Sequence, residues 1–213
     1  TDMTEIKASD GKLYVSAIFD CYDLAVLGLA MDTNMKAAIC EQTLDNAYKA
    51  YPMLRGAILH SDRGTQYTSE LYRNAINKYG ILQSMNSAGG RCHDNARCES
   101  MWARFKEELL YGRYDATSMT VEQLKTLIWR YFISYWNNRR ICSANGGLPP
   151  MVKRQQYYAS TNFFLCSRRF LLWIATSSSR LLFSTFAFNS SSDMDSYFGF
   201  FALLTLSFSF IFL

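Results

Sequence analysis

Short apolar stretches separated by turn residues recur along the first half of the chain and predict β-strands. The predicted strands are residues 1–7, 13–19, 24–31, 56–60 and 81–85. Asp10-Gly11 is a strong hairpin signal between the first two strands, so the first three form an antiparallel meander. We expect the fourth strand to run parallel to the first after a helical crossover.

Apolar residues about 3.6 positions apart predict helices between and after these strands. The predicted helices are residues 34–51, 68–78, 94–110 and 120–137. Thr33 or Asn34 can cap the first helix, and Pro52 ends it. Thr68 or Ser69 can cap the second helix and Gly80 end it. The order of elements predicts an α/β fold, a mixed five-stranded sheet flanked by helices.

Three acids stand where such a fold could bring them together. Asp62 ends the apolar run Ile58–Ser61 and is followed by a polar turn, which places its carboxylate at the rim of the sheet. Asp2 lies at the start of the first strand, and Glu99 opens a helix, with thirty-six residues between it and Asp62. Carboxylates on two strands and a helix could together hold a pair of divalent metal ions.

Three segments resemble the catalytic core of the IS-three group of bacterial insertion-sequence transposases. They are His60–Ser69, Gln83–Met85 and Asp94-Asn95-Ala96 with Glu99. That group is similar to retroviral integrases, and the resemblance covers residues 1–157. It implies a ribonuclease-H-like fold and a catalytic, metal-binding triad of Asp2, Asp62 and Glu99. The family usually has thirty-five residues between its second and third acids, and we assign the extra one to the loop 86–93.

The resemblance also implies a reaction, a cofactor and partners. The reaction is hydrolytic nicking at an element end, followed by attack of the freed 3′-hydroxyl on target DNA. The cofactor is Mg²⁺, for which Mn²⁺ can substitute. The partners are element-end and target DNA and further copies of the chain, with no small-molecule substrate. A nuclease that cleaves without joining, and an inactive DNA-binding remnant, are the alternative interpretations.

Several polar residues near the acids are candidate DNA contacts. Lys106 follows Glu99 by two helical turns and faces the same side, and the resemblance implies contact with the element end there. The other candidates are Arg63, Gln66, Asn95, Arg139 and Arg140. Each has a plainer alternative: a solvated side chain for Lys106, Arg139 and Arg140, a turn role for Arg63 and Gln66, and helix capping for Asn95.

Other chemistry-bearing residues near the acids receive structural interpretations. His60 shares a strand face with Asp62, and we expect a packed side chain rather than a metal ligand. Asp94 is interpreted as a helix N-cap, which leaves Glu107 and Glu108 as rivals of Glu99. The cluster of Cys92, His93 and Cys98 lacks the spacing of a zinc site.

Bulk composition narrows the setting without deciding the function. The formal charge of +4 is compatible with nucleic acid binding. Six cysteines without a CxxC pair, and no N-terminal signal peptide, favour a cytoplasmic protein. The resemblance implies that this protein is bacterial and associated with DNA. The chain does not begin with Met, and the family's first strand starts earlier, after a helix-turn-helix region. We therefore expect a fragment or the product of a broken gene.

The composition changes near residue 158. Residues 161–213 hold twelve of the fifteen Phe and eleven Ser, but no Lys or Pro. We interpret 1–157 as the catalytic core and 158–213 as out-of-frame or read-through sequence. Tyr197–Leu213 has seventeen residues without a charge, the low edge of a membrane-spanning length, so a membrane anchor is a further alternative but a disfavoured one.

Overall fold

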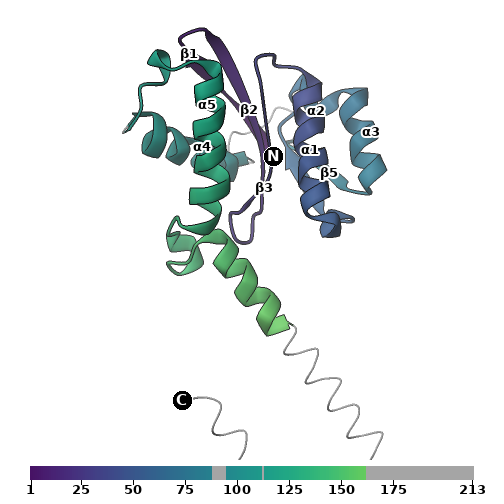
Figure 1. Ribbon diagram of the computed structural model, residues 1–213. Coiled ribbons are helices and arrows are strands. Elements are labelled where there is room, and N and C mark those ends of the chain that lie inside the picture. Colours follow the sequence, from purple (N-terminus) through teal and green to yellow (C-terminus); the bar gives the residue numbers. More distant parts are fainter. Residues whose placement is uncertain (88–94, 112, 162–213) are drawn as a thin grey trace, which may run out of the picture. The chain divides into compact units, whose positions relative to one another are not determined.

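The computed structural model describes residues 1–87, 95–111 and 113–161 of the chain (Figure 1). Thr1–Tyr158 form one compact unit, and the following description concerns that unit. Among the described residues, no helix is both long enough and apolar enough to cross a membrane. The predicted membrane-anchor segment, Tyr197–Leu213, lies outside the described residues.

An antiparallel sheet of three strands forms the centre of the unit. Its strands are β1 (Asp2–Ala8), β2 (Gly11–Phe19) and β3 (Val26–Asp32), in the order β1-β2-β3. The predicted meander is therefore confirmed, with Ala8 opposite Gly11 at the first hairpin. Gly11 has φ +153°, a backbone conformation that residues with a side chain rarely adopt.

Helices bury both faces of this sheet, and alternate residues of β2 supply the two cores. Leu13, Val15 and Ala17 pack with α4 (Ala96–Phe105) and α5 (Val121–Trp129), whereas Ile18 packs with α1 (Ala37–Ala50) and α3 (Glu70–Tyr79). Figure 1 shows α1 and α3 on one side of β1–β3 and α4 and α5 on the other. Because both faces are covered, β2 is buried from Leu13 to Phe19 apart from the half-buried Tyr14.

Helix α1 (Ala37–Ala50) packs directly on β3. A Cβ atom at Gly28 would lie 2.4 Å from the carbonyl oxygen of Thr43, so glycine permits this close approach. The helix ends before Pro52, as predicted. The predicted cap by Thr33 or Asn34 is wrong, because the N-cap residue is Lys36. Both backbone N–H groups of residues 33 and 34 instead donate to the Asp32 carboxylate.

Two parallel strands, β4 (Ile58–Ser61) and β5 (Leu82–Met85), form a second sheet. Two helices connect them, α2 (Thr65–Thr68) and α3 (Glu70–Tyr79). Ser69 caps α3 by accepting a hydrogen bond from the N–H of Tyr72, and Gly80 ends it in the left-handed conformation. Both predicted boundary residues of α3 are confirmed.

The five strands form two hydrogen-bonded sheets, where one continuous sheet was predicted. The amino group of Thr1 donates to the carbonyl oxygen of His60 at 2.7 Å, which joins the start of β1 to β4. That bond involves only the first residue, so it is too short a contact to make a ladder. Beside it lies a recess of ≈ 620 Å³ between the end of β2 and β4.

Two long helical segments complete the second core. Helix α4 (Ala96–Phe105) continues as a π-helix, Lys106–Tyr111, and α5 (Val121–Trp129) continues as a π-helix, Arg130–Trp136. Thr120 and Gln123 form a reciprocal capping box at the start of α5. Short 3₁₀ turns occupy Pro52–Leu54, Ala116–Ser118 and Ser143–Asn145. The predicted helices are confirmed, although their π-helical ends were not expected.

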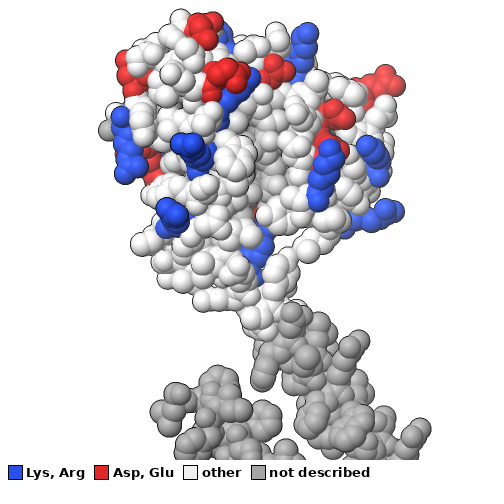
Figure 2. Space-filling view, in the orientation of Figure 1, with Lys and Arg blue, Asp and Glu red and all other residues white. Residues whose placement is uncertain are grey.

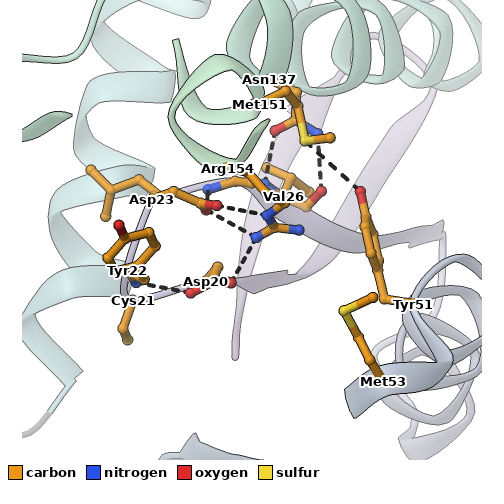
Figure 3. A network of polar contacts seen from close by, with 12 residues as sticks. Asp20, Cys21, Tyr22, Asp23, Val26, Tyr51, Met53, Asn137, Met151 and Arg154 are labelled. Atoms are coloured by element: carbon orange, nitrogen blue, oxygen red, sulfur yellow. Dashed lines mark hydrogen bonds and ion pairs between the residues drawn. The ribbon is translucent and has the colours of Figure 1, made fainter. Parts of the chain in front are cut away.

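A helix at residues 150–161 was missing from the sequence prediction. Arg154 on this helix is buried, and its Nε donates to Asp23 Oδ2 at 2.7 Å, while its Nη2 donates to Asp20 Oδ2 at 2.6 Å (Figure 3). The Asn145 side chain donates to the Asp23 carbonyl oxygen, 122 residues away. This network therefore fixes the end of the core to the β2–β3 turn.

The Arg154–Asp23 pair gives a stability prediction. Asp23 is 1% exposed, so Arg154→Gln leaves an almost fully buried carboxylate without its counter-ion. We expect the free energy of unfolding to fall by about 3–5 kcal/mol, measured by urea denaturation. The double variant Asp23→Asn/Arg154→Gln removes the orphaned charge and should recover part of the loss. Equal losses in both variants would contradict the electrostatic explanation.

Candidate active site

Asp2 is the first residue of β1 and lies opposite Ala17 of β2. Two hydrogen bonds hold Thr1, the residue before Asp2. Its hydroxyl donates to the Ala17 carbonyl oxygen at 2.9 Å, and its amino group donates to the His60 carbonyl oxygen. The start of β1 is therefore fixed between β2 and β4. Asp2 is half-buried at this position.

Asp62 directly follows β4, as the apolar run predicted. Its Oδ1 accepts a hydrogen bond from the Gly64 N–H at 2.9 Å, which fixes one carboxylate oxygen in a tight turn. A Cβ atom at Gly64 would lie 2.6 Å from Gln66 Oε1 and 3.0 Å from Asp62 Oδ1, so a side chain there would displace the ends of these two side chains. Asp2, Asp62 and Gln66 line one recess of ≈ 210 Å³.

Glu99 lies in the first turn of α4, and its side chain is exposed. Burial raises the pKa of the Asp2 carboxyl above its ordinary value, and the negative charges of Asp62 and Glu99 raise it further. The backbone N–H of Met3 and the terminal ammonium oppose this rise without cancelling it. Asp62 and Glu99 therefore both lie near enough to act on the charge of Asp2.

No described cation forms an ion pair with any of these three acids. Within the described ranges, however, no three Asp, Glu, His or Cys side chains gather closely enough to hold a metal ion. Mg²⁺ commonly takes only one or two protein carboxylates and completes its shell with water and substrate phosphate. Asp2 and Asp62, which share a recess and lack a counter-ion, fit that requirement.

The predicted DNA contacts near the acids occupy different environments. Arg63 is exposed, and its Nε donates to the Asn86 carbonyl oxygen at 2.6 Å. Gln66 faces the recess with the two aspartates. Asn95 is buried at the N-cap of α4, but its side chain makes no capping bond. Lys106 is half-buried where α4 passes into its π-helical continuation.

The predicted basic pair near the end of the core is divided. Arg139 is exposed, whereas Arg140 is buried against Glu108, with its Nε 2.9 Å from both carboxylate oxygens. Burial alone would raise the pKa of Glu108, but hydrogen bonds from Arg140 and Tyr131 lower it. Because Glu108 forms this ion pair with Arg140, its carboxylate is not free to replace Glu99 as the third metal ligand. The alternative of a solvated side chain is therefore wrong for Arg140, whereas its predicted DNA contact stays a prediction.

His60 has the packed role that we expected. Its Nδ1 lies 2.9 Å from Ser84 Oγ and its Nε2 lies 2.8 Å from Asn86 Oδ1, so both ring nitrogens have hydrogen-bond partners. These bonds connect β4 to β5 and to the residue after it. The predicted cap Asp94, and Cys92 and His93 of the disfavoured zinc cluster, lie outside the described residues.

Several known proteins are similar in sequence to this chain. Two family models, both described as Integrase core domain, match residues 1–90 and 80–150. An uncharacterized transposase-like protein of Haemophilus influenzae is 40% identical over 161 residues, which cover 73% of this chain and 69% of that protein. The chain belongs to the IS-three group of insertion-sequence transposases, with an integrase-like core.

Other members of this transposase group are longer than the matched segment. InsK, ascribed as transposase to element IS150 of Escherichia coli, is 35% identical over 74% of this chain. InsF, the transposase of insertion sequence IS3A in the same species, is 32% identical over 70% of it. The matched segment spans 54% of InsK and 50% of InsF, about half the length of each.

Solved structures support the ribonuclease-H-like fold of this transposase-group chain. The catalytic core domain of BIV integrase matches with a TM-score of 0.52 and 18% identity, covering 75% of this chain and 95% of that domain. A chain of the simian T-cell lymphotropic virus intasome, in complex with a PP2A regulatory subunit, also matches with a TM-score of 0.52 and 15% identity. The match covers 66% of this chain and 48% of that one. At such identities the likeness concerns the fold alone.

The sequence analysis missed one residue of this transposase-group site, Tyr67. It lines the recess with Asp2 and Asp62 and is 2% exposed, and burial raises the pKa of its hydroxyl well above the ordinary value. Its place in α2, five residues after Asp62, was the available signal, since one helical turn there returns the chain toward the recess.

The raised pKa of Asp2 predicts a pH-dependent stability difference. A carboxyl with a raised folded-state pKa destabilises the fold above that pKa, and the penalty disappears below the ordinary value of 3.8. Asp2→Asn should therefore raise the melting temperature at pH 7 by about 2–4 °C, corresponding to ~1 kcal/mol. The difference should shrink as the pH falls toward 4. Asp115→Asn removes an exposed acid whose pKa is lowered by hydrogen bonds from Thr117, so it should not stabilise the fold.

Proposed function

We propose that this chain is the catalytic core of a DNA transposase that cleaves insertion-sequence ends and joins them to target DNA with a divalent metal. The observation that carries the proposal is the recess that Asp2 and Asp62 share, two carboxylates that form no ion pair within the described chain, with the charge of Glu99 also acting on Asp2. Like charges held together at a sheet rim without a counter-ion favour the binding of cations. Membership of the transposase group makes DNA the substrate that fits.

The metal would be Mg²⁺, or Mn²⁺ in its place. Asp2 and Asp62 would hold it with carboxylate oxygens, the ligand type that Mg²⁺ prefers, and Glu99 would contribute from α4. When bound, such an ion supplies a polarised phosphate and an activated attacking oxygen. Gly64 fixes Asp62 Oδ1 through its N–H, which keeps this carboxylate in one orientation.

The remaining residues would position DNA rather than react with it. Lys106 and Gln66 lie on the α4 and α2 sides of the acids, and Arg63 and Asn95 flank them in sequence. Phosphoryl transfer needs charge stabilisation and positioning more than covalent help from the protein, which such a polar surround provides. We further propose that several copies assemble on DNA in the bacterial cytoplasm, as transposition joins two ends to one target.

Metal-dependent nicking of supercoiled DNA by the full chain tests the proposal. We expect nicking with Mg²⁺ or Mn²⁺, and a loss of at least about a hundredfold in Asp62→Asn and in Glu99→Gln, because each removes charge stabilisation of the transition state. Glu107→Gln is the matched control for Glu99, since it removes an exposed acid eight residues further along the same helical segment. It should retain near-normal nicking.

Thermal melts with Mg²⁺ give a second readout. A metal that binds only the folded state raises the melting temperature of the unchanged chain, and Asp62→Asn should abolish that rise. Paired element-end oligonucleotides then separate transposition from simple hydrolysis, because joined products require strand transfer. A folded chain that neither nicks DNA nor responds to Mg²⁺ would refute the proposal, and nicking without joining would support the nuclease alternative.

A further inference from the structure

The net positive charge does not by itself locate a DNA-binding surface. On the face seen in Figure 2, acidic and basic side chains are interspersed over the described residues. A more specific cationic feature lies beside α4, in a recess of ≈ 330 Å³. Three arginines line it, Arg97, Arg104 and Arg140, and no acidic residue of the described chain does.

We propose that this arginine recess binds backbone phosphates of the DNA that the candidate active site acts on, an inference that rests on the proposed function. Arg97 and Arg104 are both exposed and lie seven residues apart on α4. Two helical turns separate them, about 10.5 Å along the axis, so both side chains project from one face. DNA carries a charge every ~3.4 Å along each strand, so this span can contact more than one phosphate.

Buried and hydrogen-bonded side chains form the floor of the recess, so it is more than a group of surface arginines. Arg140 is only 9% exposed, stacks over the Trp136 ring at 4.4 Å from its centroid, and has its Nε bonded to Glu108. Trp136 is fixed in turn by donating from Nε1 to the carbonyl oxygen of Leu24. A guanidinium has five N–H donors in one plane, and the bonds to Glu108 use only Nε and Nη2.

Arg97 and Arg104, which form the walls of the recess, differ in how many of their N–H groups already donate hydrogen bonds within the chain. Arg97 donates from Nη1 to the Cys21 carbonyl oxygen at 2.7 Å, which orients its guanidinium. The guanidinium of Arg104 has no hydrogen bond or ion pair with any described residue. Ser100 and Ser143 add hydroxyl groups to the lining. Glu108 neutralises Arg140, so about two positive charges remain, and the available donors suit an anion with several acceptor oxygens.

The recess lies on a different face of α4 from Glu99 and Lys106. Positions 97 and 104 are rotated from position 99 by about half a turn, at 100° per residue. A strand bound here would therefore pass along the side of α4 opposite to Glu99. Neither Arg97 nor Arg104 was a candidate in the sequence analysis, because their shared face becomes meaningful only beside Trp136 and Arg140.

Salt-dependent DNA binding tests the proposal. Binding of the full chain to duplex DNA is measured without divalent metal, so that the result does not depend on catalysis. Arg97→Gln and Arg104→Gln should each weaken binding roughly three- to tenfold, and the double variant should lower the slope of log K against log salt by about 1.8. Arg73→Gln is the control: it removes the same charge from an exposed site on α3 and should change neither quantity beyond a small uniform effect.

Each outcome decides between the two proposals. An unchanged slope in the double variant, or no DNA binding by the unchanged chain, overturns the arginine recess. A reduced slope in a chain that cannot nick DNA supports the recess and refutes only the proposed reaction. Far-UV circular dichroism checks the fold of each variant. If Arg97→Gln unfolds through loss of its bond to Cys21, Arg104→Gln still tests the recess, since its guanidinium has no hydrogen bond or ion pair with the described residues to lose.

Discussion

The candidate site depends on how Thr1 is held between two strands. Its hydroxyl reaches the Ala17 carbonyl oxygen in β2 and its amino group reaches the His60 carbonyl oxygen in β4. Through these two hydrogen bonds Thr1 connects β2 of the three-stranded sheet to β4 of the two-stranded sheet, next to Asp2 and Asp62. Asp2 follows Thr1 and Asp62 follows β4, so the same bridge brings both carboxylates to one recess. The apolar cluster that holds Ile18, Leu59 and Tyr67 supports the same arrangement.

Local sequence signals predicted the elements wherever the deciding interaction was itself local. Ser69 and Gly80 bound α3, and Thr120 with Gln123 begins α5, because caps act within a few residues. The same reasoning failed at α1, where the Asp32 carboxylate accepts from the N–H groups of the expected cap residues. Competition between neighbouring polar side chains is not visible in a pattern of apolar positions.

Long-range polar pairs were beyond prediction for a physical reason. Arg154 meets Asp23 across 131 residues and Arg140 meets Glu108 across 32, and neither spacing has a helical or strand period. In the sequence analysis Arg140 was a candidate DNA contact, with a solvated side chain as the alternative. In the structure both arginines are buried. Arg154 pairs with the β2–β3 turn, and Arg140 stacks on Trp136 at the floor of the arginine recess. A family motif, and not a spacing rule, marked the three acids, and their shared catalytic role stays a prediction.

The contrast between paired and unpaired charges separates structural from functional residues in this chain. Burying a charge is costly unless a partner compensates it, and Asp23 and Glu108 have such partners in Arg154 and Arg140. Asp2 is also partly buried, yet its nearest charged side chains include two further acids. A fold that needed only stability would gain by neutralising Asp2. Retaining the repulsion is understandable if a cation occupies the site during function, since the same arrangement that destabilises the metal-free chain strengthens metal binding.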